Sequence, residues 1–160
     1  MQPTHESIGV FYQDTCRQYQ GRLDGLVRTQ VDTPAPPTSI DISRTALGTG
    51  ATFDAFLAAL GRCHDLTTLV ADATALSTRN LRDLCDVLMS SCPQLQSLSL
   101  RNCHFYVEAG EILARFARRH RPLVHVDVSD NPDLPIKWKR EIDRQIHLNA
   151  KEKHLEPIHS

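Results

Sequence analysis

The sequence has no long apolar run and no excess of one charge. No segment approaches the roughly 18 consecutive apolar residues that a membrane helix needs, so we expect no membrane partner. Lysine and arginine together number 18, aspartate and glutamate number 19, and the formal net charge is −1. Because a nucleic-acid-binding domain usually carries a strongly basic face, this balance argues against a nucleic-acid partner.

Targeting and metal-binding motifs are also missing. The opening MQPTHESIGV contains Glu6 and neither a basic stretch nor a long apolar one, so we expect no secretory signal and no transit peptide. The five cysteines include no Cys-x-x-Cys pair, which favours a reducing compartment such as the cytoplasm. Neither they nor the eight histidines follow a zinc-ligand spacing. The sequence therefore predicts no metal and no cofactor.

The most informative stretch is Leu95–Phe105, which reads LQSLSLRNCHF. It fits the pattern L-x-x-L-x-L-x-x-N/C-x-L, the signature of a leucine-rich repeat. Leu98 and Leu100 alternate with Ser99 and Arg101 at the period of a strand. We expect the leucines to point into a core and the polar residues to point to solvent.

This stretch recurs at steps of 28–29 residues along the chain. Four columns of matching residues result: Ile40, Leu69, Leu98 and Val126; Ile42, Ala71, Leu100 and Val128; Thr45, Thr74, Cys103 and Asn131; Leu47, Leu76, Phe105 and Leu134. Between the strands, apolar residues at helical spacing recur at the same step and predict helices over 52–60, 80–89 and 108–118. Two interlocked periods predict an α/β fold of strand-helix units.

The flanking segments read as caps for the ends of this array. Residues 4–30 carry apolar residues at three- and four-residue steps and predict one helix, which either covers the first unit or binds a partner. A proline-rich connector follows it. We predict a cap and connector over 1–36, repeats over 37–134, a C-terminal capping helix over 135–150 and a flexible tail over 151–160.

Repeats of this length resemble the ribonuclease-inhibitor-like class of leucine-rich repeat proteins, whose units pair a strand with a full helix. The resemblance covers about 37–149, although Pro37 stands where the first repeat should have leucine and Ala71 replaces a strand leucine. A short chain with helical caps is similar to the tropomodulin repeat domain and to small ciliary and centrosomal proteins of this class. The resemblance implies a solenoid of about four units that serves as a scaffold or structural subunit of a cytoskeletal, axonemal or centrosomal assembly.

Two surfaces are candidates for binding a protein partner. A free cytosolic adaptor would use the concave sheet, where the expected contacts are Asp41, Val70, Asp72, Ser99, Arg101, His125 and Asp127. An embedded subunit of a hetero-complex would use its helices, including the basic cluster RFARRHR with Arg115, Arg118, Arg119, His120 and Arg121. The sequence leaves this choice open.

An enzyme is the least favoured class. His125, Asp127 and Ser129 alternate along one strand and could share a face as parts of a hydrolase site. Alternate strand residues lie about 6.6 Å apart, however, whereas a nucleophile needs its base within about 3 Å. We therefore expect a non-catalytic protein-protein interaction module.

Overall fold

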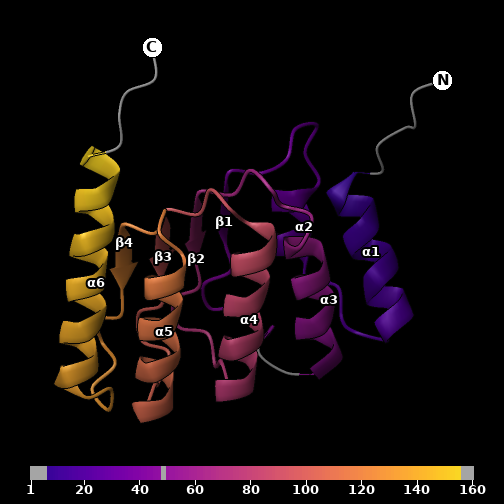
Figure 1. Ribbon diagram of the computed structural model, residues 1–160. Helices are drawn as coiled ribbons and strands as arrows, with labels where there is room; N and C mark the ends of the chain where they lie inside the picture. Colours follow the sequence, from indigo (N-terminus) through magenta and orange to yellow (C-terminus); the bar gives the residue numbers. More distant parts are fainter. Residues whose placement is uncertain (1–6, 48–49, 156–160) are drawn as a thin grey trace.

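The computed structural model describes residues 7–47 and 50–155 (Figure 1). These residues form both helices and a sheet, in agreement with the predicted α/β class. In chain order the elements are α1 (Ile8–Tyr19), α2 (Gly25–Val31), β1 (Ser39–Asp41), α3 (Gly50–Leu60), β2 (Thr68–Val70), α4 (Thr78–Ser91), β3 (Ser97–Ser99), α5 (Val107–Arg119), β4 (His125–Asp127) and α6 (Ile136–Leu155).

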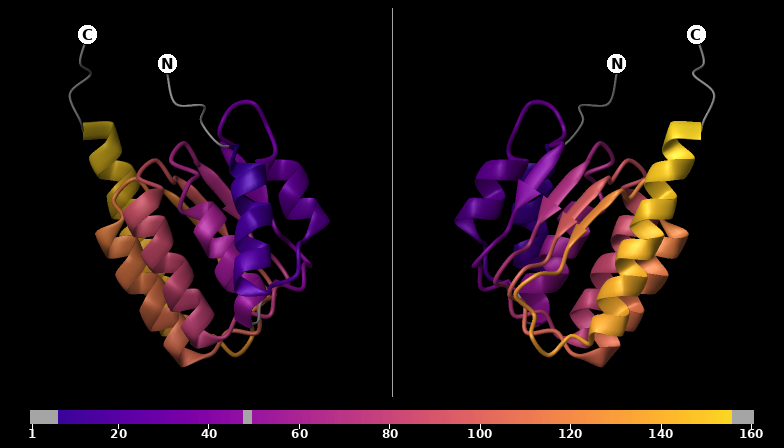
Figure 2. Two further views of the ribbon diagram at one scale, coloured as in Figure 1. Left: turned by 90° about the vertical axis from the view of Figure 1, so that its right-hand side faces the viewer. Right: turned by 90° about the vertical axis from the view of Figure 1, so that its left-hand side faces the viewer.

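The four strands form one parallel sheet in the order β1-β2-β3-β4. Its register pairs residues that lie 28 or 29 positions apart, and one row across the sheet reads Ile40, Leu69, Leu98 and Val126. That row is the first column predicted from the sequence. Figure 2 shows the helices between the strands gathered on one side of the sheet.

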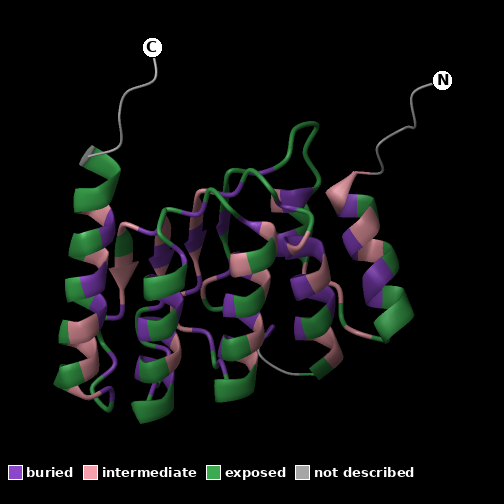
Figure 3. Ribbon diagram, in the orientation of Figure 1, coloured by how far each residue is buried: buried purple, intermediate pink, exposed green. Residues whose placement is uncertain are grey.

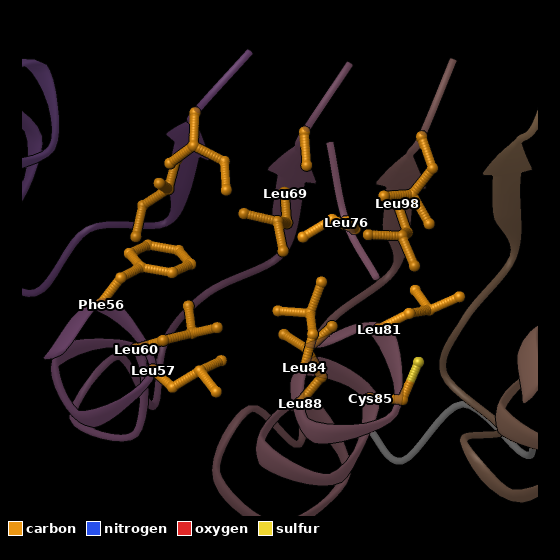
Figure 4. Close-up of a cluster of buried hydrophobic side chains, with 14 of the residues drawn as sticks. Phe56, Leu57, Leu60, Leu69, Leu76, Leu81, Leu84, Cys85, Leu88 and Leu98 are labelled. Carbon is orange, nitrogen blue, oxygen red and sulfur yellow. The ribbon is translucent and has the colours of Figure 1, made fainter. Parts of the chain in front are cut away.

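The apolar core lies between the sheet and these helices. Ile40, Leu69 and Leu98 have no exposed surface, whereas Val126 on the last strand is half-buried. In Figure 4, Leu84 and Leu88 reach from α4 toward the strands. Figure 3 shows the resulting pattern, in which each helix of this layer has a buried side and an exposed side.

The third predicted column holds the turns that follow the strands. Asn131 is buried, and its Oδ1 accepts the backbone N–H groups of Cys103 at 2.9 Å and Phe105 at 3.2 Å. Its Nδ2 donates to the carbonyl oxygens of Leu100 and Val128. In the same column the Thr74 hydroxyl donates to the Ala71 carbonyl at 2.7 Å. Small polar groups occur here because the buried turns need hydrogen-bond partners.

The prediction of one helix over 4–30 is wrong for the described residues. Helix α1 ends at Tyr19, and Gln20 has a φ of 58°, a left-handed conformation that stops the helix. Helix α2 begins after Asp24, whose carboxylate accepts the Val27 N–H at 3.0 Å. At Gly21 an added Cβ would lie 2.8 Å from the Ala51 carbonyl oxygen, so only glycine fits at this position of the turn. Residues 4–6 lie outside the described residues.

Helix α6 differs from the prediction at its C-terminal end. It continues to Leu155 rather than stopping at 150, so the first half of the predicted flexible tail is helical. Arg121 reaches Glu152 at 2.7 Å, which ties this last part to the turn after α5. The rest of the predicted tail, 156–160, lies outside the described residues.

Leu98→Ala tests the assignment of inward and outward residues on β3. Leu98 is fully buried with strands on both sides, so we expect a loss of about 2–5 kcal/mol in the free energy of unfolding. Ser97→Ala, on the other side of the same strand, should change it by less than about 0.5 kcal/mol. Urea titrations measure both variants, and equal unfolding midpoints would contradict the assignment.

Gly110→Ala tests the contact between α5 and α6. An added Cβ would lie 2.5 Å from the Cβ and Cγ of Trp138, so we expect a loss of about 1–3 kcal/mol although alanine favours helices. The control is Gly25→Ala at the start of α2, where no atom lies within 4 Å of the added carbon. The Gly25 variant should keep or raise the melting temperature. An equal change in stability at the two glycines would contradict the close contact between Gly110 and Trp138.

Candidate interaction surfaces

Five of the seven residues predicted for the concave sheet alternate with the buried row of the strands, and the other two, Asp72 and Arg101, lie in the turns after β2 and β3. We call this surface, with the outward side chains of all four strands, the open sheet face. The register places four of the seven in one row across the sheet: Asp41, Val70, Ser99 and Asp127. No helix of the described chain covers this face in Figure 2. The structure therefore brings the predicted residues together on one accessible surface.

Arg101 and Asp72 form the centre of a polar network on the open sheet face. The Asp72 Oδ1 accepts the Ser99 hydroxyl at 2.6 Å and the Arg101 backbone N–H at 2.8 Å. The Arg101 guanidinium lies 3.9 Å from Asp127 and donates to Asp130 at 3.1 Å. The network thus links the turns after three successive strands.

Asp130 is the site residue that the sequence analysis missed. It follows β4 in a turn, with a φ of 59°, and belongs to none of the four predicted columns. Because β3 pairs with β4 at a 28-residue step, its equivalent in the preceding unit is Asn102, the residue after Arg101, which also has a positive φ. That step was the available signal, because it places equivalent turn positions next to each other.

Asp127 is held as a carboxylate. Partial burial opposes its ionisation, whereas hydrogen bonds from the Ser129 hydroxyl at 2.6 Å and the Ser129 N–H at 3.0 Å favour it. The charges of Arg101 and His125 act in the same direction, and together these groups hold the pKa of Asp127 below its usual value.

The predicted hydrolase residues do not form a nucleophile-base pair. The Ser129 hydroxyl donates to Asp127, and none of the hydrogen bonds among the described residues joins His125 to Ser129. A serine nucleophile requires its proton to pass to a base such as histidine. In this arrangement the carboxylate fixes Ser129 instead.

The predicted basic cluster is divided among three surroundings. Arg115 and Arg119 line a groove of about 300 Å³ between α4 and α5. Arg118 is exposed near Glu141 of α6, and its charge helps to lower the pKa of that carboxyl, although the hydrogen bond from Arg144 contributes more. Arg121 is occupied by its ion pair with Glu152 at 2.7 Å.

His120 does not belong to the basic surface, contrary to the prediction. It is only 4% exposed, stacks on Phe116 with ring centroids 5.2 Å apart, and its Nε2 lies 3.2 Å from the Leu95 carbonyl oxygen. Burial lowers the pKa of His120, and the contact with Leu95 opposes this only in part. The imidazole is therefore a neutral part of the core.

The cysteines are buried and free. Burial raises the pKa of Cys63 to about 12 and that of Cys92 to about 11, so both thiols stay protonated at neutral pH. Among residues 7–47 and 50–155, no group of three histidine, cysteine or acidic side chains could hold a metal ion. No helix within the same ranges combines the length and apolar character needed to cross a membrane.

His120 should make stability depend on pH. An unfolded histidine gains a proton below about pH 6.5, whereas the folded His120 resists it until lower pH. The unfolded state then binds more protons, so the free energy of unfolding should fall as pH drops below about 6.5. His120→Gln does not titrate, and its amide can still donate to the Leu95 carbonyl. Urea titrations at about pH 7.5 and 5.5 should show a smaller fall in this variant; an unchanged fall would contradict the assignment.

Comparison with known proteins adds no family. No protein-family model matches the chain, and no curated protein matches it.

Proposed function

We propose that the chain is a leucine-rich repeat solenoid of the ribonuclease-inhibitor-like class and acts as a non-catalytic protein-protein interaction module. In this proposal it is a scaffold or structural subunit of a cytoplasmic hetero-complex, with a cytoskeletal, ciliary or centrosomal assembly as its setting. The open sheet face carries the proposal. It is an uncovered surface whose central side chains are already held in place by Asp72 and Arg101.

The columns of the sequence support the solenoid assignment. The first column matches the register of the parallel strands, and a helix follows each strand. In leucine-rich repeats the same spacing places the small polar column at the turn after the strand. Asn131 and Thr74 have such positions, with bonds to the turns of their own and neighbouring units.

The contacts of the terminal helices support their role as caps. The Gln30 side chain of α2 accepts the Asp41 N–H at 2.6 Å and donates to the Asp41 carbonyl at 2.7 Å, as an additional strand would. It thereby protects the edge of β1 from pairing with another chain. At the other end, Asn149 of α6 donates to the carbonyls of Ala117 and Leu123 at 2.9 Å each.

A held polar network favours recognition over chemistry. Arg101 is the one arginine or lysine among the seven residues assigned to the open sheet face, and ion pairs limit the rotamers that it can adopt. A side chain fixed before binding loses less conformational freedom when a partner docks. Arginine is also among the residues that most often dominate binding energy at interfaces. We therefore assign Arg101 as the anchor of the open sheet face.

The alternative is that the helical side is used. Arg118 and Arg119 are exposed at the end of α5 and could meet an acidic surface of a larger assembly. A free adaptor would bind one partner through the open sheet face, whereas an embedded subunit would also use this helical side. A hydrolase with His125, Asp127 and Ser129 remains the least favoured proposal.

Charge reversal on each surface separates these possibilities. Arg101→Glu would place four carboxylates side by side, and we expect it to weaken partner binding by more than about 2 kcal/mol if the open sheet face is the interface. Arg118→Glu with Arg119→Glu should be more damaging if the helical side is used. Proteins that co-purify with the tagged chain after gentle lysis would be quantified for each variant.

Arg22→Glu serves as the control, because Arg22 is exposed in the loop between α1 and α2. Retention of the partner by the Arg101 variant and its loss from the Arg118 and Arg119 variant would reject the open sheet face. The absence of any co-purifying protein in near-equal amount would count against the whole proposal.

A further inference from the structure

The groove between α4 and α5 has an apolar floor and a charged rim. Figure 1 shows the two helices side by side in the helical layer, on the opposite side of the molecule from the open sheet face. Met89 and Ile112 are half-buried on the floor. The rim is made of Arg82 and Asp86 on α4 and of Glu108, Glu111, Arg115 and Arg119 on α5.

These six charged side chains have no ion-pair partner among the described residues. Some arginines elsewhere on the surface are paired within the chain, as in Arg79 with Asp83, Arg121 with Glu152 and Arg144 with Glu141. The rim therefore keeps charges of both signs available for another surface.

The order of the charges on α5 is self-complementary. The acidic residues, Glu108 and Glu111, come first along the helix, and the basic residues, Arg115 and Arg119, come last. When a second α5 lies antiparallel, Glu108 faces Arg119 of the second copy, and Glu111 faces Arg115 of the second copy. Both pairings are centred within one residue of Leu113.

The α4 side of the rim shares this centre. In an antiparallel pair of α4 helices, Arg82 of one copy faces Asp86 of the other, and the pairing is centred on Leu84. Strand β2 pairs with β3 at a 29-residue step, and the same step carries the start of α4 to the start of α5 and Leu84 to Leu113. One two-fold axis therefore satisfies the charges of both helices at once.

We infer that the α4–α5 face binds a second copy of this chain, with antiparallel helices and the two apolar floors facing each other. The surface is small and has a charged rim around its apolar floor, which fits a reversible dimer rather than a permanent one. Exposed ion pairs weaken as salt screens them, so the association should depend on ionic strength. This dimer requires no other protein and does not rest on the function proposed above.

Two double variants and their mixture test the dimer with the purified full-length chain. Arg115→Glu with Arg119→Glu makes the α5 rim wholly acidic, and Glu108→Arg with Glu111→Arg makes it wholly basic. Each variant alone should dimerise at least about tenfold more weakly than the natural chain, because like charges then face each other. An equimolar mixture should regain association as a heterodimer. Analytical ultracentrifugation over a concentration series measures the dissociation constants.

The control, Arg22→Glu with Arg28→Glu, carries the same change in net charge as the Arg115 and Arg119 variant, on exposed residues of the N-terminal segment. This control should dimerise like the natural chain. The dissociation constant of the natural chain should rise about tenfold or more between about 50 mM and 500 mM NaCl. Circular dichroism confirms that each variant is folded. A natural chain that stays monomeric, or whose association ignores salt, would overturn the inference without using any variant. Folded variants that do not associate when mixed would also overturn it.

Discussion

The fold depends on the in-register pairing of strands that lie 28 or 29 residues apart. Each strand has only three residues, too few to be stable alone, so its inward side chain must be covered by neighbouring strands and a helix at once. Leu98 meets this condition from both sides, whereas Val126 has a strand on one side only. The buried turns depend on the same spacing, because Asn131 can bond Cys103 and Phe105 only when β4 lies beside β3.

The two ends satisfy the sheet by different means. At β1 a single amide, Gln30, occupies the backbone groups of Asp41 that another strand would otherwise bond. At the far end, α6 packs closely enough on α5 that only glycine fits opposite Trp138, and Asn149 takes up two carbonyls. Both ends use side chains that occur at one position only, so the repeat period does not predict them.

This difference explains what could be predicted from the sequence. The period identified the buried columns and the open sheet face, because a repeated environment selects the same residue types at each step. It could not identify the break at Gln20, after which Gly21 passes close to the distant Ala51. Local composition also misled at His120. The residue sits among arginines in sequence, but the turn at Leu95 offers it a buried acceptor.

The same step also decides how charges are arranged outside the core. Asp72, Arg101 and Asp130 follow β2, β3 and β4, and the pairing of those strands brings the three turns within hydrogen-bond reach. A change at Arg101 therefore acts on three strand ends. On the helical side, the 29-residue step sets Leu84 and Leu113 at matching positions, and with them the charged residues around each. A repeat that builds a continuous core thus places complementary charges at equal heights on adjacent helices. Local charge order along each helix then determines whether a second copy can pair.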